Sequence, residues 1–181
     1  MRKQIGLTLL EMLITVAIVA IVLTSVAPAM QTILIQNRII AETNELSGII
    51  QYARHHSIDQ QVDTIVCPSE NFTACTTDWN DVKMVFADVD GNGARGANED
   101  LLAATSAANP NNELSGPAVS LQFEASGAVN TPAVIMLCHK DKVDKYARAL
   151  IVSLQGRVKI SRDDDNDGVH EDNDGDALDC G

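Results

Sequence analysis

Acidic residues at alternating positions form a candidate cation site in the middle of the chain. Asp88, Asp90 and Asn92 are followed by Gly93, and Glu99 closes the series. In calcium loops of this spacing, side-chain oxygens alternate, a glycine provides the sharp turn and the last acid binds through both carboxylate oxygens. The sequence therefore predicts a Ca²⁺ site here. The alternative is an acidic hairpin turn without metal, because a strand rather than a helix is expected before it.

A second and denser acidic run fills residues 163–181, which contain no lysine or arginine. The same alternating opening recurs there, again with a glycine at the turn. The predicted Ca²⁺ ligands are the side chains of Asp163, Asp165, Asp167 and Asp174 and the backbone carbonyl of Val169. A further series that begins at Asp172 overlaps this one. The alternative is a solvated tail without metal, because acids in such a run repel one another and favour disorder.

Four cysteines provide a third kind of chemistry: Cys67, Cys75, Cys138 and Cys180. The N-terminal segment described next is expected to place them outside the cytoplasm, where disulfides persist. Four cysteines allow three pairings. The short separation favours Cys67–Cys75, which leaves Cys138–Cys180. A zinc site is the alternative, but the close Cys-x-x-Cys pairs that are typical of zinc ligands are missing.

A single carboxylate, Glu11, lies at the start of a long apolar segment. The leader before it is short and basic, and no charged side chain occurs from Met12 to Asn37. This run exceeds the about 20 residues that span a bilayer as a helix. A carboxylate in such a helix costs about 2.5–3.5 kcal/mol at the bilayer centre and less near an end, so an acid there is expected to have a partner.

These N-terminal residues resemble the class III signal of type IV pilins and pseudopilins. The resemblance implies that a prepilin peptidase cuts between Gly6 and Leu7 and methylates the new N-terminus at Leu7. It also implies that Glu11 meets the N-terminal amine of a neighbouring subunit, which relieves the cost of both charges in lipid. The implied partners are the prepilin peptidase, the inner membrane, and other minor and major pilins or pseudopilins.

Two other interpretations of this segment remain. An ordinary secretory signal peptide would use Arg2 and Lys3 as its basic region and be cleaved near residues 27–29. However, Glu11 interrupts its apolar core, and Pro28 lies inside the proposed cleavage site. The other interpretation is a membrane anchor with no role in assembly.

The elements that position these residues follow from hydrophobic periodicity. We expect one helix over residues 7–57, with about 7–35 in the membrane or filament core, because apolar residues continue at helical spacing through Ala53. Period-two patterning then predicts β-rich runs at 62–67, 82–87, 118–123, 133–138 and 147–160. A loop is expected at 101–117, with a short helical turn at 101–104. The predicted organisation is a leader at 1–6, the helix at 7–57, a β-rich domain at 58–162 and an Asp-rich tail at 163–181.

The domain carries motifs that resemble the GspH/FimT group of minor pilins and pseudopilins. They are Cys67-Pro68-Ser69, Trp79, Phe123-Glu124-Ala125-Ser126-Gly127 and Ser153-Leu154-Gln155-Gly156-Arg157-Val158. The resemblance implies a pilin-like α+β fold, in which the long helix packs on antiparallel sheet. It also implies a single-pass inner-membrane protein with a periplasmic domain, which enters a type IV pilus near its tip. A type II secretion pseudopilin and a pilus-borne calcium-dependent binding subunit are the alternatives.

Charge and motif content exclude several functions. The chain has a net charge of −12, and its basic residues are scattered along the sequence. The densest group is Lys140, Lys142, Lys145 and Arg148. Phosphate backbones bind Lys and Arg, so no nucleic-acid partner is expected. No nucleophile elbow, phosphate loop or HExxH motif occurs, so no enzyme activity is expected.

Overall fold

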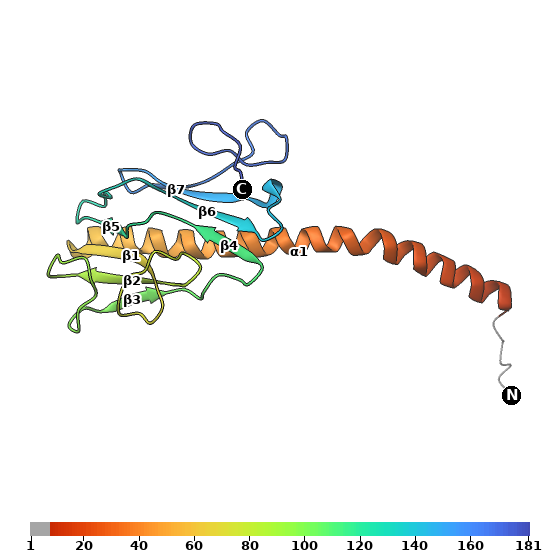
Figure 1. The fold of residues 1–181 in the computed structure, drawn as a ribbon, viewed down its shortest axis with the longest axis horizontal. Helices are drawn as coiled ribbons and strands as arrows, with labels where there is room; N and C mark the ends of the chain where they lie inside the picture. The colour runs from red at the N-terminus through yellow and green to blue at the C-terminus, as the bar shows by residue number, and fades with distance from the viewer. Residues whose placement is uncertain (1–7) are drawn as a thin grey trace. The chain divides into compact units, whose positions relative to one another are not determined.

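The computed structural model describes residues 8–181, apart from the side chains of Ser25, Ala27 and Pro28. It begins with helix α1, Leu9–Gln60 (Figure 1). Thr8 caps this helix, because its hydroxyl oxygen accepts a 3.2 Å hydrogen bond from the backbone N–H of Glu11. Glu11 lies in the first turn, where a carboxylate interacts favourably with the helix dipole.

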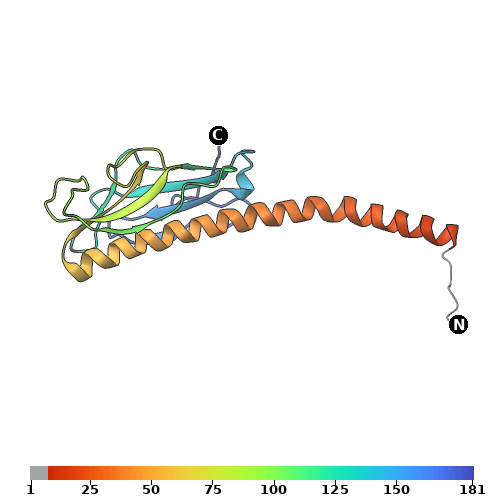
Figure 2. The same ribbon diagram turned by 90° about the horizontal axis from the view of Figure 1, so that it is seen from below.

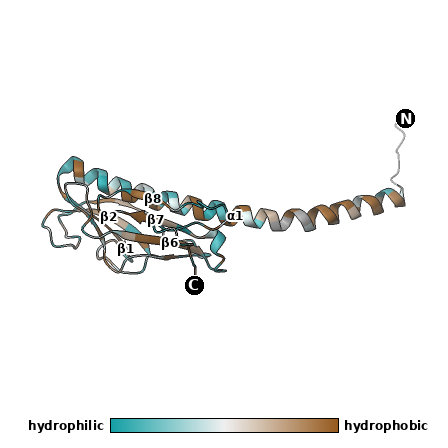
Figure 3. Cartoon of the chain, turned by 90° about the horizontal axis from the view of Figure 1, so that it is seen from above, coloured by the Kyte–Doolittle hydropathy of each residue, from teal (hydrophilic) through white to brown (hydrophobic). Residues whose placement is uncertain are grey.

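The chain divides into two compact units at residues 37 and 38. In the first unit, α1 exposes large apolar side chains from Leu9 to Leu34. Figure 3 colours this segment mainly brown and pale, in agreement with its apolar composition. By length and composition, α1 is the one helix within residues 8–181 that is able to cross a membrane.

In the second unit, α1 buries one face. Its buried positions recur every three or four residues: Ile39, Thr43, Leu46, Ile50, Ala53 and Ser57. The predicted apolar stripe is therefore confirmed for this half of the helix. The helix ends where Gln61 adopts a left-handed φ of 54° and its side-chain amide donates a 2.7 Å hydrogen bond to the carbonyl of Ile58.

Two antiparallel four-stranded sheets pack with this half of α1 (Figures 1 and 2). Sheet A has the order β3-β2-β1-β5 and sheet B the order β4-β6-β7-β8. The strands of sheet A are β1 Asp63–Ser69, β2 Val82–Asp88, β3 Leu101–Ala104 and β5 Leu121–Phe123. The strands of sheet B are β4 Asn112–Ser115, β6 Ala133–His139, β7 Arg148–Val152 and β8 Val158–Ile160. A short 3₁₀ turn, η1 Asp144–Tyr146, precedes β7.

The main core lies where α1 and the inner faces of both sheets meet. Its fully buried members include Ile50 of α1, Val66 and Val85 of sheet A, and Ile135 and Leu150 of sheet B. Side chains alternate along each strand, so the next residues point to the outer faces. The predicted α+β arrangement of one long helix on antiparallel sheet is confirmed.

Each sheet also buries part of its outer face beneath a disulfide-bonded segment. On sheet A, Phe72 and Cys75 pack against Ile65, Met84 and Phe86. On sheet B, Leu178 and Cys180 pack against Cys138, Ala147 and Ala149. The C-terminal tail is thus part of the packed domain.

The prediction of a loop at residues 101–117 is wrong in two places. Residues 101–104, expected as a helical turn, form strand β3 and pair with β2, with a register shift at Val85 and Phe86. Residues 112–115 form strand β4 and pair with β6. The run predicted at 147–160 is divided by a tight turn between β7 and β8, where Gly156 has a φ of 71° and its N–H donates to the carbonyl of Ser153.

Candidate functional site

The N-terminal segment with the predicted cleavage, methylation and pairing residues is only partly covered by the structure. Gly6 and Leu7, the predicted cleavage and methylation residues, lie outside the described residues. Glu11 is exposed in the first turn of α1. Within residues 8–181, no hydrogen bond or ion pair reaches its carboxylate. The described residues therefore offer this carboxylate no hydrogen-bonding or charged partner.

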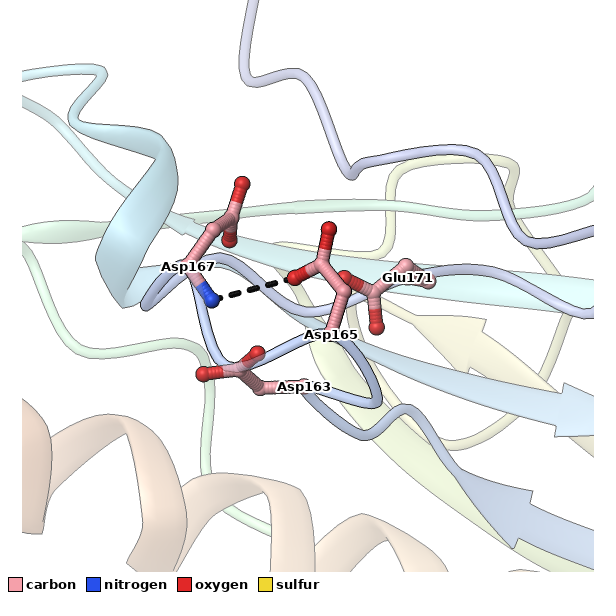
Figure 4. A group of neighbouring side chains, drawn as sticks. All are labelled: Asp163, Asp165, Asp167 and Glu171. Carbon is pink, nitrogen blue, oxygen red and sulfur yellow. Dashed lines mark hydrogen bonds between the residues drawn. The ribbon is translucent and has the colours of Figure 1, made fainter.

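The acidic tail brings four carboxylates together, those of Asp163, Asp165, Asp167 and Glu171 (Figure 4). One oxygen from each lies within 4.8 Å of the others. Two hydrogen bonds from the backbone of the loop orient these carboxylates. The N–H of Asp167 donates to Asp165 Oδ1 at 3.0 Å, and the N–H of Gly168 donates to Asp163 Oδ2 at 3.0 Å. Hard cations such as Ca²⁺ bind clustered carboxylate oxygens of this kind.

Asp163 adds an observation that fits a cation at this loop. Its Oδ1 is buried and accepts no hydrogen bond from any described residue. A buried acceptor without a donor is costly, and a bound cation would remove that cost. Glu171, only 8% exposed, uses Oε2 to accept a 2.7 Å hydrogen bond from the N–H of Asp164, which fixes its carboxylate beside the aspartates.

The fourth carboxylate of this cluster is that of Glu171, whereas the sequence predicted Asp174 as a ligand. Asp174 is not among the clustered carboxylates, and its N–H donates instead to Asp172 Oδ1 at 2.8 Å. The signal for Glu171 was available, since it occupies the ninth position of a loop counted from Asp163, a position that commonly serves calcium. Val169, predicted as a carbonyl ligand, donates its N–H to Asp167 Oδ1 at 2.7 Å and so lies on the same loop.

The overlapping series that begins at Asp172 forms a closed turn. Asp172 Oδ1 accepts hydrogen bonds from the N–H groups of Asp174 and Asp176, at 2.8 and 3.1 Å. These bonds favour the ionised form and lower the pKa of the Asp172 carboxyl. The carboxylate of Asp172 is thus stabilised by N–H groups of its own turn.

The loop after β2 gathers Asp88, Asp90 and Glu99, as predicted from their spacing. Asn92 lies on the same loop, where its N–H donates to Asp88 Oδ1 at 3.1 Å and its side-chain oxygen accepts from the N–H of Ala94 at 2.7 Å. Asp88 and Glu99 are 2% and 6% exposed, whereas Asp90 faces solvent. Carboxylates of the right type and spacing therefore meet at this loop.

Glu99 is stabilised as an anion by backbone donors. Its Oε2 accepts a 2.7 Å hydrogen bond from the N–H of Gly96, and its Oε1 accepts one of 2.7 Å from the N–H of Val89. The bond from Gly96 is the largest cause that lowers the pKa of Glu99, with smaller contributions from the backbone of Val89 and Asp90 and the charge of Arg95. Compared with the tail cluster, this loop is more fully satisfied by its own hydrogen bonds.

The four cysteines form the two favoured disulfides, Cys67–Cys75 and Cys138–Cys180. The first joins β1 to the loop that follows it. The second ties the end of the acidic tail to β6, with 5.8 Å between the two Cα atoms. The second bond is what fixes the tail beside sheet B.

Two models of known protein families match the sequence. A family model described as type II transport protein GspH matches residues 42–156. The chain belongs to the GspH family. A second model, the prokaryotic N-terminal methylation motif, matches residues 1–27. The acidic tail lies beyond both matches. No curated protein matches the sequence.

Two solved structures share the fold of this GspH-family chain. The type IV minor pilin FimU of Pseudomonas aeruginosa is 17% identical, with a TM-score of 0.54 over 70% of this chain and 90% of that one. The minor pseudopilin EpsH from the type II secretion system of Vibrio cholerae is 12% identical, with a TM-score of 0.52 over 69% of this chain and 96% of that one. The predicted pilin-like fold is thereby confirmed.

Family, methylation motif and apolar helix together identify the protein as a minor pilin or pseudopilin of a type IV pilus or a type II secretion system. Such a subunit is anchored in the inner membrane with its globular domain in the periplasm. Other subunits of the same assembly are its general class of partner.

Proposed function

We propose that this GspH-family protein is a minor pilin that primes assembly of a type IV pilus and lies near its tip. In this proposal, the peptidase cuts between Gly6 and Leu7, Leu7 is methylated, and Glu11 pairs with the N-terminal amine of a neighbouring subunit. The observation that carries the proposal is Glu11, an exposed acid without a partner in residues 8–181, at the start of an apolar helix that matches the methylation motif. The role is recognition and polymerisation, without catalysis.

The energetics favour pairing between subunits. A carboxylate inside lipid costs up to about 2.5–3.5 kcal/mol, and an ammonium group has a similar cost. Either charge alone would oppose assembly, whereas contact between them offsets both costs. Since no charged residue occurs from Met12 to Asn37, α1 places no cationic side chain within one or two turns of Glu11 on its C-terminal side.

The processing step is tested by mass spectrometry of the protein extracted from membranes. A chain that starts at methylated Leu7 is expected. A chain that starts near Met30 would identify an ordinary secretory signal and would overturn the proposal.

The assembly step is tested with Glu11→Ala. This variant is expected to be cleaved and methylated normally but to be absent from sheared pilus fractions. Glu45→Ala, which removes an exposed acid from the second half of the same helix, is the matched control and should be incorporated. Normal incorporation of Glu11→Ala would contradict the pairing.

The type II secretion pseudopilus is the alternative machine. A deletion strain separates the two: loss of surface pili with normal export of secreted proteins supports the pilus, and the reverse result supports the pseudopilus. The wild-type chain must restore whichever phenotype is lost.

We also propose that the tail loop binds Ca²⁺ through Asp163, Asp165, Asp167 and Glu171, with the carbonyl of Val169 as a further ligand. The four clustered carboxylates and the buried, unpaired Oδ1 of Asp163 support it. The same proposal extends to Asp88, Asp90, Asn92 and Glu99, where the support is the clustering of the three carboxylates. In both loops the ion would offset repulsion between neighbouring acids.

Calcium binding is tested by calorimetry and by the melting temperature with and without EDTA. Added Ca²⁺ should raise the melting temperature, because a ligand that binds only the folded state stabilises it. Asp165→Asn and Asp90→Asn are each expected to remove one binding event, whereas Asp141→Asn, a change at an exposed acid outside both loops, should remove none. No heat of binding and no shift with EDTA would exclude calcium.

A further inference from the structure

A groove runs between the second half of α1 and the edge strand β8, within the compact unit of residues 38–181. It consists of two hollows of about 500 and 480 Å³. Both are lined by Gln51 of α1 and Val158 of β8, so they are adjacent. The apolar side chain of Ile58 lines one end and the buried Ser47 the other.

Basic residues that are scattered along the sequence lie close together at this groove. The fold gathers four of the 13 lysines and arginines along it: Arg54, Arg157, Lys159 and Arg162. His55 lies beside them. Of the residues that the structure describes, no aspartate or glutamate lines either hollow. In a chain with a net charge of −12, this is a local surplus of positive charge that fits an anionic ligand.

Strand β8 is also an open edge of sheet B. Its order, β4-β6-β7-β8, leaves β8 paired on one side only. The N–H of Ser161 donates to Ala149 of β7, and the carbonyl of Arg157 accepts from Ser153. Since backbone groups alternate in direction along an antiparallel strand, the N–H and C=O groups of Val158 and Ile160 point toward the open side. An extended peptide is able to pair with them.

The side chains of β8 predict which residue types alternate along such a peptide. Val158 and Ile160 pack against the main core on the α1 side. Arg157 and Lys159 therefore leave the strand on the opposite face, where they line a hollow with Ile151, and they also border the groove beside α1. A strand added to β8 would present alternate residues to these two faces, so one set should be apolar and the other acidic.

We propose that the edge of β8 binds an extended acidic peptide segment of another subunit of the filament, added to sheet B as a strand. The acids of this segment pair with Arg157 and Lys159, and its apolar residues lie on the same face of the sheet as Val158 and Ile160. The proposal rests on the proposed assembly function only for the source of the segment. The binding itself depends on the groove, the charges and the open strand edge.

A second copy of this chain is the less suitable occupant. Its most acidic segment is the tail, but that segment is folded into turns, with Asp172 Oδ1 bound to two backbone N–H groups, and is fixed by the Cys138–Cys180 disulfide. An added strand has to be free and extended. The tail does not meet this condition.

The test uses full-length protein in detergent and short fluorescent peptides, with binding followed by anisotropy. A peptide that alternates Glu and Val should bind, and its affinity should fall as salt rises. A peptide that alternates Gln and Val should bind about tenfold more weakly, because the charge pairs are lost. Failure of the Glu/Val peptide to bind, or equal binding of the Gln/Val peptide, would overturn the proposal.

Variants locate the site. The double variant Arg157→Glu/Lys159→Glu changes two exposed side chains and should weaken binding of the Glu/Val peptide by about tenfold or more. The double variant Lys140→Glu/Lys142→Glu makes the same change of charge at exposed positions outside the groove and should bind as the wild type does. Equal effects of the two pairs would contradict a site at β8.

Strand addition itself is tested by backbone methylation of the peptide. Only alternate N–H groups of an added strand face β8, so methylation at the Glu positions and at the Val positions should differ: one set abolishes binding and the other preserves it. Equal effects of both sets would exclude strand pairing.

Two further probes decide between occupants. A peptide of residues 171–179 that binds more tightly than the Glu/Val peptide would assign the groove to a second copy, and a DNA duplex that does so would assign it to nucleic acid. Either result overturns the proposal. Processing at Leu7 and the incorporation defect of Glu11→Ala are measured separately, so a failure of peptide binding would leave the proposed assembly function in place.

Discussion

Arg54 of helix α1 donates a 3.0 Å hydrogen bond from Nε to the carbonyl oxygen of Gly127 in the loop after β5. The same carbonyl oxygen lies only 2.0 Å from the point where a Cβ atom at Gly156 would stand. Gly156 belongs to the turn between β7 and β8. The helix, the loop after sheet A and a turn of sheet B therefore meet at one backbone oxygen, and the close approach requires glycine at position 156.

Gly156→Ala is expected to destabilise the domain by at least about 2 kcal/mol. The backbone there has a φ of 71°, which costs an L residue about 1–2 kcal/mol, and the new methyl group would meet a backbone oxygen that is unable to move freely. Gly48→Ala is the matched control, because Gly48 lies in the helix with nothing within 4 Å. It should stabilise the domain by about 0.5–1 kcal/mol. Urea unfolding of both variants measures the difference, and equal stabilities would contradict the packing at Gly127.

Glu42 is expected to hold α1 against the loop that leads into β4. Its Oε1 accepts a 3.0 Å hydrogen bond from the N–H of Asn109, and its Oε2 accepts one of 2.6 Å from the buried side-chain amide of Asn112. Bonds to a charged acceptor are worth about 1.5–3 kcal/mol. Glu42→Ala should therefore lower the free energy of unfolding by about 2 kcal/mol, and Glu42→Gln by less, because the amide keeps one acceptor.

The control for Glu42 is Asn44→Ala, which removes an exposed, uncharged side chain from the same stretch of the helix. It should not lower the free energy of unfolding by more than about 0.5 kcal/mol. If Asn44→Ala is as costly as Glu42→Ala, general helix effects and not the bonds to residues 109 and 112 explain the loss.

The main elements were predictable because their side-chain periods are strong. The second half of α1 buries residues at helical spacing, and β1, β2 and β6 carry the β-branched and aromatic residues that favour strands. Strands β3 and β4 were missed for a physical reason. Leu101-Leu102-Ala103-Ala104 favours helix, and Asn112-Glu113-Leu114-Ser115 contains few strand formers. Both lie at sheet edges, where pairing with β2 and β6 decides their conformation.

Some of the candidate functional residues were predictable from the sequence and others were not. Local spacing predicts the acidic clusters, since their members are close in sequence, although it selected Asp174 over Glu171. The basic groove was not predictable, because Arg54 and Arg157 are brought together only by packing of α1 beside β8. Contacts between distant parts of a chain leave no periodic signal in its sequence.

Acid should destabilise the domain through Glu99. Backbone donors lower its folded pKa below the ordinary value of 4.5, so its stabilising effect is fully present above pH 4.5 and is lost as the pH falls through the folded pKa. Glu99→Gln is expected to melt at a lower temperature than the wild type at pH 7 in EDTA, and the gap should narrow toward pH 3. Glu113→Gln, at an exposed position of β4, should follow the wild-type curve. A gap for Glu99→Gln that stays constant with pH would contradict this role.

The two disulfides should contribute unequally to stability. Cross-linking reduces the entropy of the unfolded chain more when the enclosed loop is longer, by about 4 kcal/mol for a separation of 42 residues and about 2.5 kcal/mol for 8. Replacing Cys138 and Cys180 by Ala should therefore lower the free energy of unfolding more than replacing Cys67 and Cys75.

Loss of Cys138–Cys180 should also release the tail from β6, because Cys180 and Leu178 cover Ala147 and Ala149 there. Limited proteolysis is then expected to cut within residues 163–181 in this variant and not in the Cys67/Cys75 variant. Urea unfolding of the two double variants gives the order of stabilities. A tail that resists protease without its disulfide would show that packing of Leu178 and the hydrogen bonds of the acidic turns hold it by themselves.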